Sequence, residues 1–111
     1  MTPAEILRAA KAKIEDPAHW CRGGYAMTAY GAFVGPKDYR ACQWCGAGAV
    51  RAVTDTSDFA SRAAPIYLLR AAAEKLGGSS YTPFEQFNDE ADHATVMKAF
   101  DIAIELAEAS Q

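Results

Sequence analysis

Residues 92–108 read DHATVMKAFDIAIELAE and form the most regular pattern in the chain of 111 residues. Apolar side chains recur there every three or four positions, at Val96, Met97, Phe100, Ala103, Ile104 and Ala107. The polar positions between them carry Lys98, Asp101, Glu105 and Glu108. This spacing predicts an amphipathic helix, capped by Asp89 or Asp92, that packs by one face against other helices.

Further helices are predicted on both sides of the middle of the chain. Thr2, Pro3 and Glu5 have the residue types and spacing of a capping box, so a helix is expected to begin at Pro3. A second helical segment is predicted within residues 55–76, and a short one within residues 82–87. These patterns place helices near the N-terminus and throughout the second half of the chain.

The middle of the chain has a different character. Residues 25–34 read YAMTAYGAFV and predict a short β-hairpin turning near Tyr30-Gly31, which must lie on the helices because two lone strands are marginally stable. Residues 40–53 are rich in alanine and glycine, and they predict a central helix with Cys45 near its start. Asn88-Asp89 is expected to form a loop whose side chains cap the last helix.

The predicted fold class is mainly α, with four to five helices and one short β-hairpin in a compact single domain, residues 1–111. A chain of this length buries roughly 65% of its unfolded surface in one domain and is too short for two. No alternation of strands and helices indicates a nucleotide-binding sheet. The sequence also contains none of the phosphate loops or serine-nucleophile turns that mark common enzyme families.

Charge is unevenly distributed along the chain. Residues 1–53 carry seven basic and four acidic side chains, whereas residues 54–111 carry four basic and ten acidic ones, for a net charge of −3. Direct nucleic-acid binding is not expected, because binding to phosphates needs clustered cations. No uncharged run reaches the ~20 apolar residues of a spanning helix. With three cysteines and no recognisable export signal, a cytoplasmic location is expected.

One interpretation makes the protein a small enzyme. Cys45, near a helix start, could serve as nucleophile, with His93 as its base and Asp89 or Asp92 orienting the imidazole. The opposing interpretation is that Cys45 is a small buried apolar side chain, which is where free cysteine is most often found. A depressed thiol pKa would distinguish the first interpretation from the second.

A zinc-stabilised binding module is another alternative. Cys42 and Cys45 have the spacing of a zinc knuckle, and His19 and Cys21 could supply two further ligands. A single Cys-x-x-Cys pair is a weak indication of a metal site. Cys42 and Cys45 can also be explained as side chains of the hydrophobic core. We therefore expect no metal and no cofactor.

Several segments together resemble a family of small uncharacterised bacterial and phage proteins. The resemblance rests on Trp20 and Gly23, Trp44-Cys45-Gly46-Ala47-Gly48-Ala49, Phe87-Asn88-Asp89, His93 and the closing helix. The chain departs from the family at Gly46 and Val50, where bulkier apolar side chains are expected, and this departure favours a shorter or looser central helix. The resemblance implies a cytoplasmic accessory protein, often carried by a phage or mobile element, and no enzymatic activity follows from it.

The leading functional hypothesis is therefore a non-enzymatic protein that binds another protein, as a phage- or mobile-element-encoded modulator of a host system. The expected contact residues are Trp44, Asn88, Asp101, Glu105 and Glu108. Homodimerisation through an exposed apolar stripe is compatible with so helical a chain. Neither nucleic acid nor a membrane is an expected partner.

Overall fold

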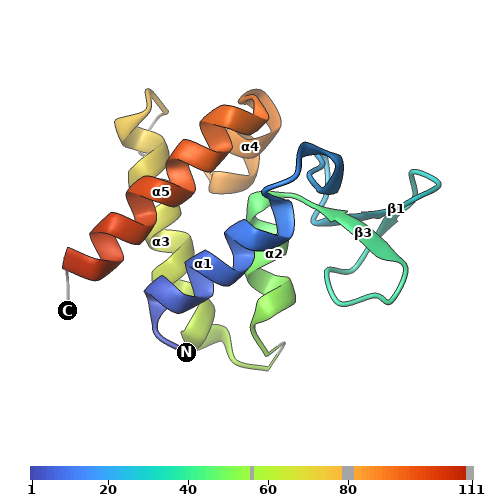
Figure 1. Ribbon diagram of the computed structural model, residues 1–111, viewed down its shortest axis with the longest axis horizontal. Helices are drawn as coiled ribbons and strands as arrows, with labels where there is room; N and C mark the ends of the chain where they lie inside the picture. The colour runs from blue at the N-terminus through green and yellow to red at the C-terminus, as the bar shows by residue number, and fades with distance from the viewer. Residues whose placement is uncertain (56, 79–81, 110–111) are drawn as a thin grey trace.

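The computed structural model describes residues 1–55, 57–78 and 82–109. Within these residues it contains five α-helices, one 3-10 turn and a small antiparallel sheet, so the predicted mainly α class is confirmed (Figure 1). The helices are α1 (Pro3–Ile14), α2 (Gly46–Val53), α3 (Phe59–Lys75), α4 (Phe84–Glu90) and α5 (His93–Ala109). The strands are β1 (Ala26–Thr28), β2 (Phe33–Val34) and β3 (Ala41–Trp44), and the 3-10 turn is η1 (Pro17–His19).

All five helices contribute to one hydrophobic core. Leu7 of α1, Val50 of α2 and Leu69 of α3 are fully buried, as are Phe84 of α4 and Phe100 of α5. The apolar stripe predicted for the last helix faces this core, because its buried positions are Val96, Ala99, Phe100, Ala103 and Ala107. The core therefore lies among the helices, and the sheet stands at one side of it (Figure 1).

The predicted capping box opens α1. The Thr2 hydroxyl accepts a hydrogen bond from the Glu5 backbone N–H at 3.2 Å, and the Glu5 carboxylate accepts one from the Thr2 N–H at 2.9 Å. These reciprocal bonds satisfy backbone donors that a helix start otherwise leaves unpaired. The local sequence is thus sufficient to define this helix start.

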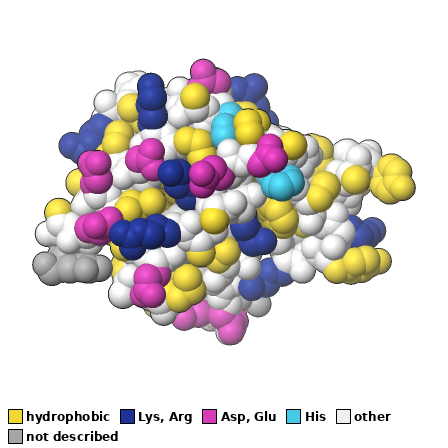
Figure 2. Space-filling view, in the orientation of Figure 1, with side chains coloured by type: hydrophobic (Ala, Val, Ile, Leu, Met, Phe, Trp, Pro, Cys, Tyr) yellow, Lys and Arg dark blue, Asp and Glu magenta, His cyan; other side chains and the backbone are white. Residues whose placement is uncertain are grey.

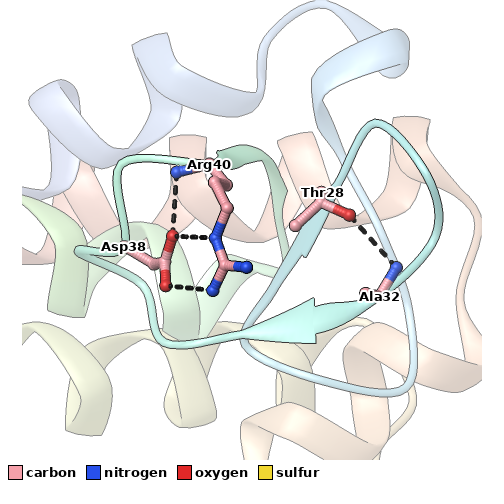
Figure 3. Close-up of polar contacts among 4 residues, drawn as sticks. All are labelled: Thr28, Ala32, Asp38 and Arg40. Carbon is pink, nitrogen blue, oxygen red and sulfur yellow. Dashed lines mark hydrogen bonds and ion pairs between the residues drawn. The ribbon is translucent and has the colours of Figure 1, made fainter.

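The predicted hairpin is also present, as β1 and β2. Gly31 lies in its turn with φ of +83°, a left-handed conformation that glycine adopts without strain. The Thr28 hydroxyl accepts a hydrogen bond from the Ala32 backbone N–H at 3.2 Å and holds the two ends of the turn together (Figure 3). The turn of the hairpin therefore lies near Tyr30-Gly31, as the sequence predicts.

The central helix predicted for residues 40–53 is wrong in its first part. Residues 41–44 form strand β3, which pairs antiparallel with β1 in a sheet of order β2-β1-β3, and the helix begins only at Gly46. The physical reason is the distant backbone partner: Ala26 lies opposite Trp44, and Met27 lies opposite Gln43. The resulting helix is shorter than its alanine-rich pattern predicts, in line with the departure noted at Gly46.

The loop that leads into β3 is closed by an ion pair. Arg40 donates from its backbone N–H and its Nε to one carboxylate oxygen of Asp38, at 2.8 and 3.0 Å, and from Nη2 to the other oxygen at 2.9 Å (Figure 3). The Arg40 guanidinium and backbone lower the pKa of Asp38 to about 2. Arg40 is therefore committed to its own loop.

The two Trp-Cys pairs of the sequence come together beside the sheet. Trp20 forms an isolated parallel bridge with Trp44, and the Cys21 N–H donates to the Trp44 carbonyl at 3.1 Å. Cys21 is buried there. This contact brings the segment after α1 alongside β3. In the part of the chain described, no helix is both long and apolar enough to cross a membrane.

Candidate functional site

Asn88 connects three parts of the fold. Its Oδ1 accepts hydrogen bonds from Trp20 Nε1 at 2.8 Å and from the Gly46 N–H at 2.9 Å, and its Nδ2 donates to the Cys21 carbonyl at 3.1 Å. The side chain has 0% exposed surface. The predicted loop at Asn88-Asp89 is therefore wrong, because α4 continues through Glu90, and a direct binding role predicted for Asn88 does not fit its complete burial.

A pocket of about 270 Å³ lies between the segment that leads into β1, the residue that precedes α2, and α4. We call it the acidic pocket, and it is lined by Gly23, Gly24, Tyr25, Cys45, Glu85 and Asp89. It brings together Cys45 and Asp89, two of the three residues of the predicted catalytic set. The pocket is therefore the candidate site, and the chemistry of its walls decides what it can do.

The two glycines form one edge of the acidic pocket and support an exposed aromatic ring. A Cβ atom on Gly24 would come within 2.5 Å of Cδ1 of Phe33, and one on Gly23 within 3.2 Å of the same ring. Glycine is thus needed for Phe33 to lie flat against this segment. Phe33 nevertheless keeps 56% of its surface exposed, so an exposed apolar ring lies against the glycine segment that lines the pocket.

Two carboxylates one helical turn apart give the pocket its acidic character. Glu85 accepts a hydrogen bond from the Tyr25 hydroxyl at 3.0 Å, and Asp89 accepts one from the Gly23 N–H at 2.9 Å. Each carboxylate has acceptor sites beyond the one used in this way. Both groups are held in place from the opposite wall and can still receive donors from a ligand.

Two neighbouring groups have raised pKa values, mainly because they are buried and partly because of these carboxylates. Burial raises the pKa of Cys21 to about 11, and the charge of Asp89 adds to the effect. Burial and then the bond to Glu85 raise the pKa of Tyr25. Arg51 lies over the Tyr25 ring, 4.4 Å from its centroid, and opposes part of this field. The pocket therefore combines two carboxylates with largely apolar walls, and the Arg51 guanidinium lies against one of those walls, the Tyr25 ring.

Cys45 lies at the start of a helix as predicted, but its thiol is not activated. Its Sγ caps α2 by accepting the Gly48 N–H at 3.2 Å, and only 3% of the residue is exposed. Burial raises the pKa of Cys45 to about 12, and this effect outweighs the stabilising N–H groups of the helix. The thiol therefore stays protonated near neutral pH and forms the floor of the pocket.

His93 is occupied elsewhere. Its Nε2 lies 2.7 Å from the Ile14 carbonyl oxygen, and its ring meets that of Trp20 edge-on with centroids 5.6 Å apart. Asp89 in turn bonds Gly23 rather than the imidazole. Cysteine, histidine and aspartate thus do not form the hydrogen-bonded series that the enzyme interpretation requires.

The zinc alternative depends on whether its four candidate ligands converge. Within the described residues, no group of three His, Cys, Asp or Glu side chains lies close enough together to hold a metal ion. The Cys42 thiol lies 3.6 Å from the Met27 carbonyl oxygen, and the three cysteines are unpaired thiols. Cys42 therefore belongs to the packing of the sheet.

The acidic face predicted on the last helix is largely paired within the chain. Asp101 forms an ion pair with Lys11 at 2.8 Å, and Glu108 forms one with Arg8. Acidic and basic side chains consequently alternate over the face made by α1 and α5 (Figure 2). Glu105 is exposed. This surface is less negative than the sequence of α5 alone indicates.

Trp44, another predicted contact residue, is half-buried and serves the fold. Its Nε1 donates to the Pro36 carbonyl at 2.9 Å, and Lys13 Nζ lies 4.2 Å from its ring centroid.

Sequence reasoning missed Tyr25 and Glu85 as site residues. The spacing of Glu85 and Asp89, four positions apart before the last helix, was the available signal, but the predicted loop at Asn88 separated them.

Residues 1–106 match the model of a family described as a family of unknown function (DUF6197), and the chain belongs to that family. Membership confirms the expected kinship with an uncharacterised family. No curated protein and no solved structure matches the chain. The geometry of the acidic pocket is therefore the main basis for a functional proposal.

Proposed function

We propose that the protein acts by binding a partner protein, and that the acidic pocket receives a lysine or arginine side chain of that partner. The observation that carries the proposal is the pair of carboxylates on α4, Glu85 and Asp89, facing a pocket whose floor is a protonated thiol. Such a pocket offers acceptors to a cation and no activated nucleophile.

The size of the pocket supports a single side chain as the occupant. Sites for drug-sized ligands typically enclose roughly 300–1,000 Å³. The acidic pocket, at about 270 Å³, falls just below that range. An ammonium or guanidinium group at the end of a narrow aliphatic stem matches this volume and supplies the donors that the carboxylates lack.

The exposed ring of Phe33 extends the contact beyond the charge pair. Phe33 stands on Gly23-Gly24 at the edge of the pocket, and the sheet that carries it projects from the helices (Figure 1). Hydrophobic side chains are also exposed at the projecting end of the molecule in Figure 2, with basic and other side chains between them. We expect the partner to place an apolar residue next to its basic one, because aromatic residues are enriched at protein interfaces.

The proposed setting follows the expectations from the sequence. Three unpaired thiols are compatible with the cytoplasm. An accessory role as a phage- or mobile-element-encoded modulator of a host protein would need a partner-binding surface of this kind. A homodimer in which one copy supplies the basic side chain is a special case of the same recognition.

A peptide-library selection on the immobilised full chain tests the proposal. We expect the enriched peptides to carry lysine or arginine beside an apolar residue. The double variant E85Q/D89N, which keeps hydrogen-bond acceptors but removes both charges, should lose this enrichment. Titration of Nα-acetyl-arginine amide, followed by amide chemical shifts, should perturb Gly23 and Gly24 in the parent protein.

The matched control is E105Q/D101N, which removes two charges from α5 and leaves the acidic pocket intact. Enrichment of basic peptides on this control and on the parent, but not on E85Q/D89N, supports the proposal. Equal enrichment on all three proteins would refute it, as would peptides without basic residues. Loss of enrichment only on the α5 variant would instead favour the acidic face of the last helix.

A further inference from the structure

We propose a second binding site between α2 and α3 for a small ligand that carries a carboxylate or phosphate on an apolar body. We call it the arginine pocket. It has a volume of about 220 Å³ and is lined by Arg51, Phe59, Arg62, Ala63 and Ile66. Its lining combines two guanidinium groups with an aromatic and an aliphatic wall.

Arg51 is a half-buried cation without an anionic partner in the described residues. Its Nε is buried and makes no hydrogen bond there, and its guanidinium rests on the Tyr25 ring. Leaving a buried charged donor unpaired is costly, and most such groups in proteins are paired. An oxyanion in the adjoining pocket would balance this charge.

Arg62 brings a second guanidinium to the same cavity. Only 9% of this residue is exposed, and its guanidinium carbon lies 4.7 Å from the centroid of the Phe59 ring. Two cations beside one small cavity repel each other unless negative charge lies between or near them. The arrangement thus favours an anion over a neutral or cationic ligand.

Two acidic groups, Asp55 and Asp58, interact with Arg62 of the arginine pocket. Both have lowered pKa values, first through hydrogen bonds from Ser57 and Ser61 respectively, and also through the charge of Arg62. They balance part of the field of Arg62 from the exposed start of α3. Neither forms an ion pair with Arg51, whose guanidinium contacts the Tyr25 ring instead.

The geometry of the two guanidinium groups and the apolar walls of the arginine pocket define the class of ligand that it would bind. A guanidinium presents its donors in a planar fork that matches a carboxylate or a phosphate. Phe59 and Ile66 add apolar surface, and the volume admits only a small body. Phenyl phosphate and benzoate are therefore suitable probes, with inorganic phosphate and acetate as the same anions without an aromatic body.

The test is a titration of the full chain with each probe, followed by backbone amide chemical shifts. We expect saturable shifts at Phe59, Arg62 and Ala63, and stronger binding of phenyl phosphate or benzoate than of the anion alone. Arg51→Gln should weaken binding about tenfold, since hydrogen bonds to charged groups contribute on this scale. Lys75→Gln, which removes one charge from the far end of α3, is the control and should bind as the parent does.

Because loss of Arg51 also removes its contact with Tyr25, a second variant keeps the test independent of that contact. Ala63→Trp fills the cavity from an exposed position and should abolish the shifts while the unfolding temperature stays near that of the parent. Saturable binding that persists unchanged in both variants would overturn the proposal, as would the absence of saturable shifts with every probe. Preference for phosphate or for carboxylate then identifies the anion.

Discussion

Replacing Asn88 with alanine should be among the most destabilising single substitutions in this protein. The change removes the Oδ1 atom that accepts from both Trp20 Nε1 and the Gly46 N–H, and the Nδ2 group that donates to the Cys21 carbonyl. Each buried group left without a partner costs about 1–3 kcal/mol. Because Trp20 is only half-buried and water can reach part of it, we expect a total loss of about 3–5 kcal/mol.

Urea unfolding followed by far-ultraviolet circular dichroism measures this loss directly. The matched control is Gln86→Ala, which removes a similar amide from an exposed position on the same helix, where it bonds Glu90 at 3.0 Å. That control should change the free energy of unfolding by no more than about 0.5 kcal/mol. The reasoning would be refuted if Asn88→Ala cost no more than Gln86→Ala.

Three further outcomes follow from buried contacts. Gly48→Ala should cost more than about 2 kcal/mol, because its Cβ would lie 1.9 Å from the Tyr25 carbonyl oxygen, whereas Gly35→Ala meets nothing within 4 Å and should be nearly neutral in urea unfolding. In native alkylation read by mass spectrometry, half-exposed Cys42 should be labelled before Cys45, and prompt labelling of Cys45 would contradict its burial. Folding raises the pKa of Cys45 from 9.0 to about 12, so the unfolded chain loses the thiol proton at lower pH than the folded chain does. The free energy of unfolding should therefore fall as the pH rises between those two values. In the Cys45→Ala variant, the free energy of unfolding should change less with pH over that range.

Local sequence signals predicted the helices that carry their own start and stop information. The capping box at Thr2 and Glu5 and the apolar stripe of α5 need only nearby residues, and both were correct. The turn at Gly31 was predictable for the same reason. These elements are the ones in which propensity, capping and hydrophobic pattern agree.

The errors arose where a distant partner decides the local structure. Ala41–Trp44 has no strong strand pattern, and it becomes a strand because β1 offers it a backbone ladder. Asparagine is common in helix caps and turns, yet Asn88 lies inside a helix. Its amide forms hydrogen bonds there with three groups that are distant in the sequence. The intrinsic secondary-structure propensity of the residues is a weak predictor in both cases, because tertiary contacts override it.

The candidate site was predicted only in fragments for the same reason. Cys45 and Asp89 were named, but in roles that depend on an exposed thiol and a nearby imidazole. Burial of Cys45 and the position of His93 against Ile14 are products of packing that spacing alone does not encode. Tyr25 joins the site only because its hydroxyl reaches Glu85 of α4 at 3.0 Å, across 60 positions of the chain.

The bonds of Asn88 span 42, 67 and 68 positions of the chain, so one amide fastens an early segment to a late one. If the Asn88 amide is released together with the bonds of Gly23 to Asp89 and of Tyr25 to Glu85, the segment around Trp20 and Cys21 would separate from α4 with the helical core still closed. Hydrogen–deuterium exchange should then speed up together at the amides of this segment. In the opened form Glu85 and Asp89 no longer face Gly23 and Tyr25 across the acidic pocket. Binding of the partner would therefore be lost together with the hydrogen bonds of Asn88.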